Sequence, residues 1–293
     1  MNIAIYSRFL KKEQRPYVQE LFKCLEEQNY NVFIFEDYLK TLKNEIKFLS
    51  KHETFSCYED IIRQNIDIMI SLGGDGTLLD TVCLIKDSGV PVAGVNLGRL
   101  GFLADIHKEE IRALVEAIEN DTYTIQERAL IHVETNKPLF GEENFGLNEV
   151  SILKTDSSSM ITVHVYLNGE FLSTYWADGL IIATPTGSTA YSLSCGGPII
   201  FPTSGNFVLT PIAPHNLNAR PIVIPDNTVV SFEVECRSRY FLCAIDSRNK
   251  LADKTYQIAI RKESFPFRLF KMPDSHYLKT LREKLNWGED SRN

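Results

Sequence analysis

The chain has 293 residues, of which 44% are hydrophobic, so it is long and apolar enough for one large domain or two ordinary ones without disulfides or a structural metal. Its formal net charge of −7 argues against a general affinity for nucleic acid and leaves room only for a local basic pocket that binds phosphates. The six cysteines are scattered, the N-terminus has no signal-peptide pattern, and no segment approaches the ~20 apolar residues of a membrane span, so we expect a reduced, cytoplasmic protein that binds no membrane.

The first third alternates short apolar runs with segments of helical period, which is typical of βαβ units and a parallel sheet. We predict strands at Asn2–Tyr6, Asn31–Glu36, Asp67–Leu72 and Val90–Val95, and a helix at Pro16–Glu27 with Val18, Leu21, Phe22 and Leu25 on one stripe. Each glycine cluster then follows the carboxyl end of a strand. Ligands bind at that edge in open α/β sheets.

From about Tyr123 to residue 270, short alternating runs rich in Val, Ile, Thr and Tyr predict a mostly antiparallel β domain. We predict strands at Met160–Leu167, Phe171–Trp176 and Thr228–Cys236, with a two-residue hairpin turn at Asn168-Gly169. The tail Pro273–Trp287 returns to helical spacing, with Tyr277, Leu278, Leu281 and Leu285 as its apolar face. The expected fold is an α/β amino-terminal domain with a mostly parallel sheet (residues 1–122 plus the tail 271–293) and a β-rich carboxyl-terminal domain (residues 123–270).

The segment Gly73-Gly74-Asp75-Gly76-Thr77 lies between an expected strand and an expected helix, Leu78–Lys86. Its glycines let backbone amides approach phosphate oxygens, and the helix amino end adds a favourable dipole. An aspartate there can accept a proton from a substrate hydroxyl or help to hold Mg²⁺, as phosphoryl transfer requires. Taken alone, the segment fits a phosphate site and a tight turn with an aspartate that caps the helix equally well. The chain contains neither G-x-x-x-x-G-K-[ST] nor G-x-G-x-x-G, so it carries no P-loop or Rossmann signature.

Three further segments carry polar or glycine residues at strand ends. The stretch Gly94 to Leu103 suits close backbone approach to a ligand, with Phe102 able to line an adenine or ribose pocket, although such a stretch is more often a loop under a helix. Asn148-Glu149 can bracket the two hydroxyls of a ribose, or be surface residues at a strand start. Asp178-Gly179 to Ser194 runs from an apolar strand into a turn rich in hydroxyls, which offers short donors to a polar ligand.

In order and spacing, these segments resemble the NAD kinase family. The match rests on Gly73-Gly74-Asp75-Gly76, Gly94 to Leu103, Asn148-Glu149, and the run from Asp178-Gly179 through Thr-Pro-Thr-Gly-Ser-Thr-Ala-Tyr to Tyr191. That last run separates NAD kinases from diacylglycerol and sphingosine kinases and 6-phosphofructokinases, which share the glycine turn. The resemblance implies two domains with an active site between them, usually in a homotetramer. The implied reaction phosphorylates the 2′-hydroxyl of the adenosine ribose of NAD to give NADP, with ATP or polyphosphate as donor and a divalent metal such as Mg²⁺.

The resemblance also implies roles for single residues. Asp75 would activate the ribose hydroxyl, and Gly73, Gly74, Gly76 and Thr77 would take the donor's phosphates with the metal, which we assign no direct protein ligand. The implied contacts with NAD are Asp75, Gly76, Phe102, Asn148, Glu149, Asp178, Thr186, Thr189, Ala190, Tyr191 and Ser194.

The chain departs from the family pattern at two places. Tyr175-Trp176-Ala177 precede Asp178 where many bacterial members have a basic residue, and Asp246-Ser247 stands where the family often has Asp-Gly, at which we expect a structural turn. We assign His215 no role.

Two other classes of function compete with the kinase. A lipid kinase with the same glycine turn would need a membrane-binding surface, and the sequence has no basic amphipathic helix. A dinucleotide sensor without catalysis would not need Asp75.

Overall fold

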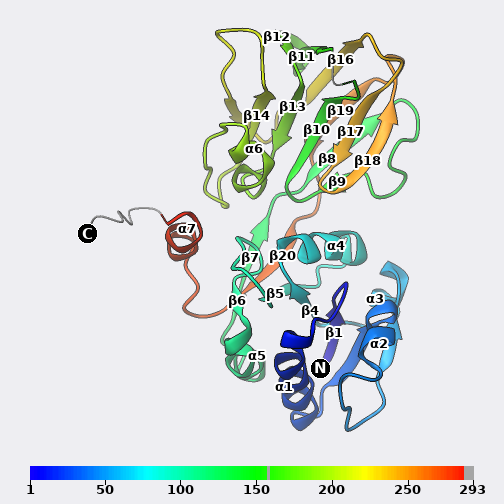
Figure 1. Ribbon diagram of the computed structural model, residues 1–293, viewed down its shortest axis with the longest axis vertical. Helices are drawn as coiled ribbons and strands as arrows, with labels where there is room; N and C mark the ends of the chain where they lie inside the picture. Colours follow the sequence, from blue (N-terminus) through cyan, green and yellow to red (C-terminus); the bar gives the residue numbers. More distant parts are fainter. Residues whose placement is uncertain (157–158, 287–293) are drawn as a thin grey trace. The chain divides into compact units, whose positions relative to one another are not determined.

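The computed structural model describes residues 1–156 and 159–286 and divides the chain into two compact units (Figure 1). The first unit is Met1–Glu127 together with the described residues from Phe267 onward, and the second unit is Arg128–Pro266. The first is an α/β unit with a mostly parallel sheet, and the second is built of antiparallel strands. The predicted fold class is therefore confirmed.

The first unit is organised around one sheet of eight strands among the described residues. In spatial order these are β3 (Glu53–Phe55), β2 (Asn31–Phe35), β1 (Asn2–Tyr6), β4 (Ile68–Gly73), β5 (Val92–Asn96), β20 (Phe267–Lys271) and β7 (Thr124–Arg128), and β6 (Ile106–His107) pairs with β5. From β3 to β20 each neighbouring pair is parallel. The four strands predicted here are present, each within about two residues of its predicted ends.

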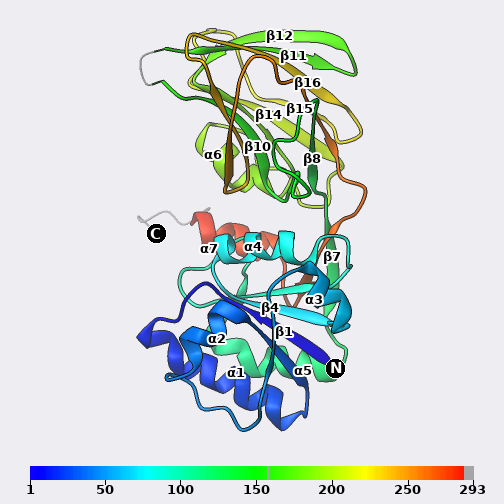
Figure 2. The same ribbon diagram turned by 90° about the vertical axis from the view of Figure 1, so that its right-hand side faces the viewer.

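Helices cover both faces of this sheet. Figure 2 shows α1 (Arg15–Glu27), α2 (Glu36–Leu42) and α5 (Ile111–Glu119) on one face and α4 (Asp75–Ile85) on the other. The predicted stripe of α1 is confirmed, because Val18, Leu21, Phe22 and Leu25 are all fully buried against the strands. Helices α2 and α5 and the short α3 (Tyr58–Arg63) were not predicted.

The tail helix is shorter than predicted. Helix α7 spans Tyr277–Leu285, and Trp287 lies outside the described residues. Leu281 is buried, but Leu278 is 50% exposed, so only part of the predicted apolar face packs. No helix in the described part of the chain is long and apolar enough to cross a membrane.

The second unit is a sandwich of two antiparallel sheets. One runs β15 (Ile222–Pro225), β14 (Asn206–Ile212), β13 (Gly179–Ala183), β10 (Glu149–Lys154), β17 (Phe241–Ile245) and β18 (Arg248–Ala252). The other runs β12 (Glu170–Ala177), β11 (Ile161–Leu167), β16 (Val230–Cys236), β19 (Ile258–Lys262), β8 (Ile131–Thr135) and β9 (Phe145–Gly146). Alternate residues of both sheets form one apolar core, which includes Val133, Ile152, Val163, Leu180 and Phe232.

The hairpin predicted at Asn168-Gly169 joins β11 to β12. Both residues have positive φ, 52° and 84°, as a two-residue turn of this type requires. After β13 the chain forms a single helical turn, α6 (Tyr191–Ser194). Between β13 and this turn lies a short 3-10 turn, Gly187–Thr189. The segment from Thr186 to Ser194 and the start of β10 carry most of the second unit's candidate site residues.

Candidate active site

In the first unit, the predicted glycine turn joins β4 to α4. The strand ends at Gly73 and the helix begins at Asp75, with Gly74 between them in an extended conformation. A side chain at Gly73 would collide with Thr77, since its Cβ would lie 2.3 Å from the Thr77 hydroxyl oxygen. In contrast, a Cβ at Gly74 or Gly76 would meet no protein atom within 4 Å. The turn therefore presents open space beside the amino end of α4, as a phosphate site needs.

The Asp75 carboxylate holds the loop of the second predicted glycine segment. Its Oδ2 accepts a hydrogen bond from the Phe102 N–H (2.8 Å), and its Oδ1 accepts from Leu103 (3.1 Å) and Ala104 (2.9 Å). Gly101 is required beside it, because a Cβ there would lie 1.9 Å from Asp75 Oδ1. A carboxylate has about four acceptor positions, so one remains on Oδ2. Asp75 thus joins the two glycine segments and can still accept one more hydrogen bond.

A cluster of polar side chains beside the turn was missed by the sequence analysis. Arg8 forms an ion pair with Asp80 and donates from Nη2 to the Gly76 carbonyl (3.1 Å), while the Tyr6 hydroxyl donates to Asp80 (2.9 Å). Burial, followed by the neighbouring Asp80 charge, raises the Tyr6 pKa. Arg8 lies just past the carboxyl end of β1, so the rule that located the glycine turns would also have found it.

In the second unit, the predicted Asn148-Glu149 pair lies at the start of β10. The Asp246 carboxylate accepts hydrogen bonds from the backbone N–H groups of Leu147 (2.9 Å), Asn148 (2.8 Å) and Glu149 (3.1 Å). Asp246 itself lies in the β17–β18 turn with a φ of 50°. The residue is in a turn, as expected, and its side chain holds the candidate site.

The Glu149 carboxyl is buried, with 9% of the residue exposed, and no hydrogen-bond partner for its Oε2 exists among the described residues. Burial, followed by the nearby Asp246 charge, raises its pKa from 4.5 to about 8, against the lowering effect of the Tyr191 backbone N–H. A buried carboxyl oxygen without a partner is costly in a folded protein. The Glu149 Oε2 is therefore open to one further hydrogen bond.

The hydroxyl-rich run after β13 packs on the Asn148 backbone. The Thr184 N–H donates to the Asn148 carbonyl (2.9 Å), and the Thr184 hydroxyl donates to the Leu147 carbonyl (2.6 Å). A Cβ at Gly187 would lie 2.0 Å from the Asn148 carbonyl oxygen, so only glycine allows this contact. The structure therefore brings the third and fourth predicted segments together.

Most hydroxyls of that run have partners inside the fold. Ser188 donates to the Pro185 carbonyl (2.6 Å), Thr189 donates to the Thr186 carbonyl (3.1 Å), and the buried Arg128 donates to the Thr186 hydroxyl (3.4 Å). The Ser188 and Thr189 hydroxyls thus donate to backbone carbonyls of the turn itself, whereas the Thr186 hydroxyl accepts from Arg128 and keeps its own proton for another partner.

The remaining predicted contacts are more exposed. Tyr191 is 40% exposed, Ala190 is half-buried, and Ser194 is exposed at the end of α6. Asp178 forms an ion pair with Lys154 (2.6 Å) and lines an open pocket of about 660 Å³ with Trp176 and His215.

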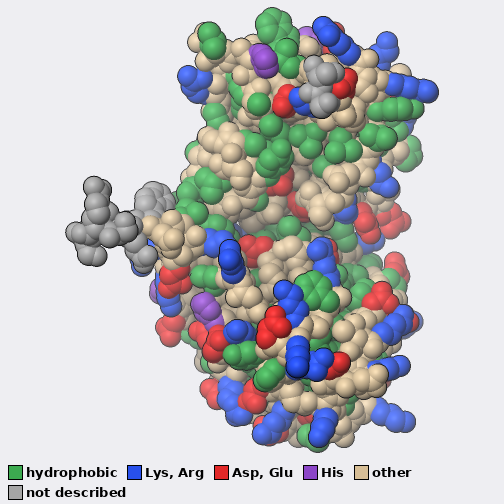
Figure 3. Space-filling model, viewed as in Figure 1, with side chains coloured by type: hydrophobic (Ala, Val, Ile, Leu, Met, Phe, Trp, Pro, Cys, Tyr) green, Lys and Arg blue, Asp and Glu red, His purple; other side chains and the backbone are tan. Residues whose placement is uncertain are grey.

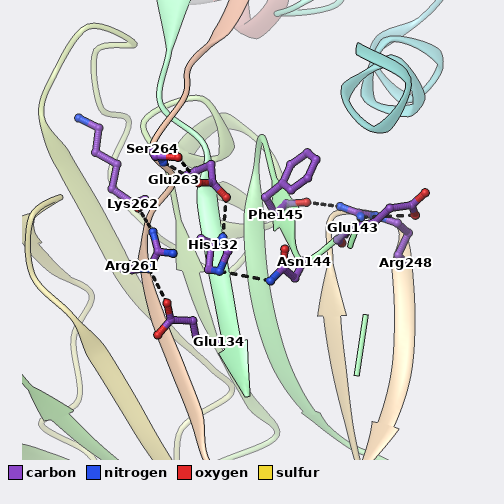
Figure 4. A network of polar contacts seen from close by, with 10 residues as sticks. All are labelled: His132, Glu134, Glu143, Asn144, Phe145, Arg248, Arg261, Lys262, Glu263 and Ser264. Atoms are coloured by element: carbon purple, nitrogen blue, oxygen red, sulfur yellow. Dashed lines mark hydrogen bonds and ion pairs between the residues drawn. The ribbon is translucent and has the colours of Figure 1, made fainter. Parts of the chain in front are cut away.

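A second network holds the chain that leads into Asn148 (Figure 4). The Asn144 amide donates to His132 Nε2 (3.2 Å), so the ring proton lies on Nδ1 and is donated to Glu263 (2.5 Å). Burial acts to raise the Glu263 pKa, but the hydrogen bonds from His132 and Ser264 keep it below its ordinary value. Arg248 donates to the carbonyls of Glu143 and Phe145.

Comparison with known proteins identifies the family to which both units belong. Residues 3–123 match the model of the ATP-NAD kinase N-terminal domain, and residues 147–272 match that of the ATP-NAD kinase C-terminal domain. The NAD kinases of Cytophaga hutchinsonii and Flavobacterium psychrophilum are 45% and 42% identical to this chain, over 100% of both chains in each pair. The chain belongs to the NAD kinase family, which is a family of phosphotransferases.

Solved structures agree with this fold. The structure of yeast NADH kinase complexed with NADH superposes with a TM-score of 0.88 at 23% identity, covering 99% of this chain and 88% of the other. The structure of an NAD kinase from Archaeoglobus fulgidus in complex with ATP has a TM-score of 0.77 at 24% identity, covering 98% and 100%.

Proposed function

We propose that the protein transfers the γ-phosphoryl group of ATP to the 2′-hydroxyl of the adenosine ribose of NAD and so forms NADP. The observation that carries this proposal is the Asp75 carboxylate, which is fixed at the amino end of α4 by three backbone N–H groups and keeps one acceptor position on Oδ2. A ribose hydroxyl is a poor nucleophile, so a positioned carboxylate that accepts its proton assists the attack.

The glycine turn is the proposed site of the donor's phosphates. Gly74 and Gly76 leave open space beside the first turn of α4, and Gly73 and Thr77 shape that turn. We propose that polyphosphate can enter the same space, because the open space at Gly74 and Gly76 needs only phosphate oxygens and not a base. Arg8, held by Asp80 against the Gly76 carbonyl, adds a positive charge beside the turn.

We propose Mg²⁺ as the metal that accompanies the donor. Within residues 1–156 and 159–286, no three His, Cys, Asp or Glu side chains are grouped to hold a metal ion. The side chains present thus fit an ion bound mainly through nucleotide phosphates and water, with one or two carboxylates such as Asp75, as is common for Mg²⁺. When bound, the ion would neutralise charge on the transferred phosphoryl group.

The proposed NAD contacts fall in both units. In the second unit, Asn148 and Glu149 bracket ribose hydroxyls, which would give the Glu149 Oε2 its missing partner. Thr189 and Ala190 contact the adenine, and Tyr191 forms part of the wall of the site. The regions of the nicotinamide ribose and the adenine are lined by Asp178, Thr186 and Ser194. In the first unit, Asp75, Gly76 and Phe102 contact the reacting ribose.

We further propose a cytoplasmic homo-oligomer, a homotetramer by family resemblance, that binds neither nucleic acid nor membrane. Its six scattered cysteines fit a reducing compartment. On the face shown in Figure 3, acidic and basic side chains are interspersed on the first unit, unlike a nucleic-acid surface. Strand β12 ends its sheet and exposes Phe171 and Trp176, which fits a surface that another copy covers.

The test is NADP formation by the purified protein from NAD, ATP and Mg²⁺, followed with an NADP-specific dehydrogenase. A signal that needs all three components is the expected result. No signal with any donor or metal, while NAD still binds, would instead support a dinucleotide sensor. Loss of both activity and NAD binding would direct the search to lipid substrates.

A further inference from the structure

Two residues of the β17–β18 turn form hydrogen bonds with the backbone of one segment, residues 143 to 149. Arg248 donates to the carbonyls of Glu143 and Phe145 (Figure 4), and Asp246 accepts from the N–H groups of residues 147 to 149. The two holding residues are separated only by Ser247. Together they form hydrogen bonds with backbone groups on both sides of Gly146, in the residues that lead into Glu149.

This segment needs such support because the sheet does not supply it. The ladder between β10 and β13 begins at the pair Glu149–Ala183, so Leu147 and Asn148 lie outside it. The segment also passes very close to the turn, since a Cβ at Gly146 would lie 2.5 Å from Ile245 Cγ2 and 3.0 Å from Asp246 Oδ1. The Asp246 side chain thus replaces the strand partner that these amides lack.

We propose that Asp246 and Arg248 are positioning residues that set the Asn148–Glu149 pair against the ribose of NAD, and that they serve this substrate and not the phosphoryl donor. The inference rests on the proposed function, and it adds two residues that touch neither substrate in the proposed arrangement.

The choice of a carboxylate for this position also supports a functional role. A hydroxyl or amide oxygen can accept backbone N–H groups without placing a second negative charge beside the buried Glu149. The groups that act on the Glu149 carboxyl are the Asp246 charge and the Tyr191 backbone N–H, and Cys195 and the Tyr191 hydroxyl lie within its electrostatic reach. Burial raises the Asp246 pKa, while the hydrogen bonds from the three backbone N–H groups and the Arg248 charge act to lower it and so favour the charged form. Asp246 therefore favours a Glu149 that carries a proton and can both donate to and accept from a ribose diol.

The experiment compares Asp246→Asn and Arg248→Met with the wild type by steady-state kinetics. Asp246→Asn places an amide where the Leu147 N–H needs an acceptor, and it removes the charge beside Glu149. We expect the KM for NAD to rise by about tenfold or more, the loss expected for a disturbed hydrogen-bonded site, with the KM for ATP nearly unchanged. The midpoint of the pH dependence of kcat/KM for NAD should also fall by roughly one pH unit, because a like charge is removed. Arg248→Met removes the hydrogen bonds to the two carbonyls and the positive charge beside Asp246, but it keeps the Asp246 carboxyl. It should therefore raise the KM for NAD without that fall.

Two controls separate positioning from general damage. Ser247→Ala changes an exposed side chain of the same turn, and Asp253→Asn changes a partly exposed aspartate of the same unit whose partner is Thr255 in its own loop. Both should retain wild-type values of KM. The inference is overturned if Asp246→Asn changes the two KM values equally, or lowers only the melting temperature and leaves the pH dependence in place.

If the wild type forms no NADP, the proposed function fails separately. The same variants are then compared by equilibrium binding of NAD, where a wild-type Kd for Asp246→Asn and Arg248→Met overturns the inference. If Asp246→Asn does not fold, Arg248→Met decides the outcome.

Discussion

Asp75 and Asp246, which belong to different units, make the same kind of contact. Each carboxylate accepts hydrogen bonds from three successive backbone N–H groups, those of Phe102 to Ala104 for Asp75 and those of Leu147 to Glu149 for Asp246. Four of these six amides, those of Phe102, Leu103, Asn148 and Glu149, belong to segments that the sequence marked as ligand-binding. In each unit, a single aspartate therefore fixes a loop that is distant in sequence.

Asp75→Asn tests whether this carboxylate also acts on the substrate. We expect turnover to fall by about 10²- to 10⁴-fold, as for removal of a general base, while NAD binding changes little. Because an Asn amide cannot accept all three N–H groups, we also expect a lower melting temperature. A variant that loses thermal stability but keeps wild-type kcat would limit Asp75 to holding the loop.

Alanine at the open glycines tests the phosphate site without disturbing the protein. Gly74→Ala and Gly76→Ala add a methyl group that meets no protein atom within 4 Å. If donor phosphates occupy that space, the KM for ATP should rise by about tenfold or more with an unchanged melting temperature. Gly205→Ala, whose Cβ has only ordinary contacts, is the control. Wild-type kinetics in both variants would place the phosphates elsewhere.

Gly101→Ala should behave in the opposite way. Its Cβ would lie 1.9 Å from Asp75 Oδ1, so the carboxylate or the loop must shift. We expect both a lower melting temperature and a loss of turnover at saturating NAD and ATP. Normal turnover would show that catalysis does not need Asp75 in this arrangement.

The raised pKa of Glu149 predicts how the stability of the ligand-free protein depends on pH. Since the folded-state pKa is about 8 and the ordinary value is 4.5, the folded protein keeps a proton between these values that the unfolded chain has released. Stability from this group therefore falls as pH rises from about 4.5 to 8. Glu149→Gln should melt several degrees higher than the wild type at pH 8.5, equal it near pH 4.5, and bind NAD more weakly.

Glu170→Gln is the matched control, because Glu170 is exposed. Melting curves of the three proteins from pH 4.5 to 9 measure the effect. A constant difference between Glu149→Gln and the wild type across this range would contradict the raised pKa.

Lys271 and Asp105 form a buried ion pair in the first unit, with side-chain exposures of 10% and 4%. Asp105 directly follows Ala104, whose N–H bonds to Asp75. Lys271→Met leaves the carboxylate without its cation, so we expect a loss of about 3–5 kcal/mol in the free energy of unfolding by urea. Lys40→Met, which breaks an exposed pair with Asp37, should leave the free energy of unfolding nearly unchanged. Equal effects would mean that burial adds nothing to the pair.

Local patterns account for what the sequence could predict. The stripe of α1 and the strand β1 were found because their burial follows a regular period, and Asn168-Gly169 because its turn type depends on two adjacent residues. Strand β18 was missed because Arg248, Asn249 and Lys250 show no apolar alternation.

The site was predicted less completely, for a related reason. Its motifs are local, but the groups that hold them are remote: 99 residues separate Asp246 from Leu147, and 72 separate Arg8 from Asp80. No short window of sequence contains both partners of such a contact. The Asp246 turn was expected, but its bonds to Leu147, Asn148 and Glu149 could be seen only in the fold.

The contact between Gly187 and the Asn148 carbonyl has a consequence for redesign of this enzyme. Because the two segments touch through backbone atoms, neither can be exchanged alone for a loop of different shape. A library that randomises residues 184–191 while keeping 147–149 would mostly yield misfolded chains, whereas transplanting both segments from one homologue, with the residue at position 246, preserves their fit. Variants with altered dinucleotide preference are thus best made by exchanging residues 147–149, 184–191 and 246 together.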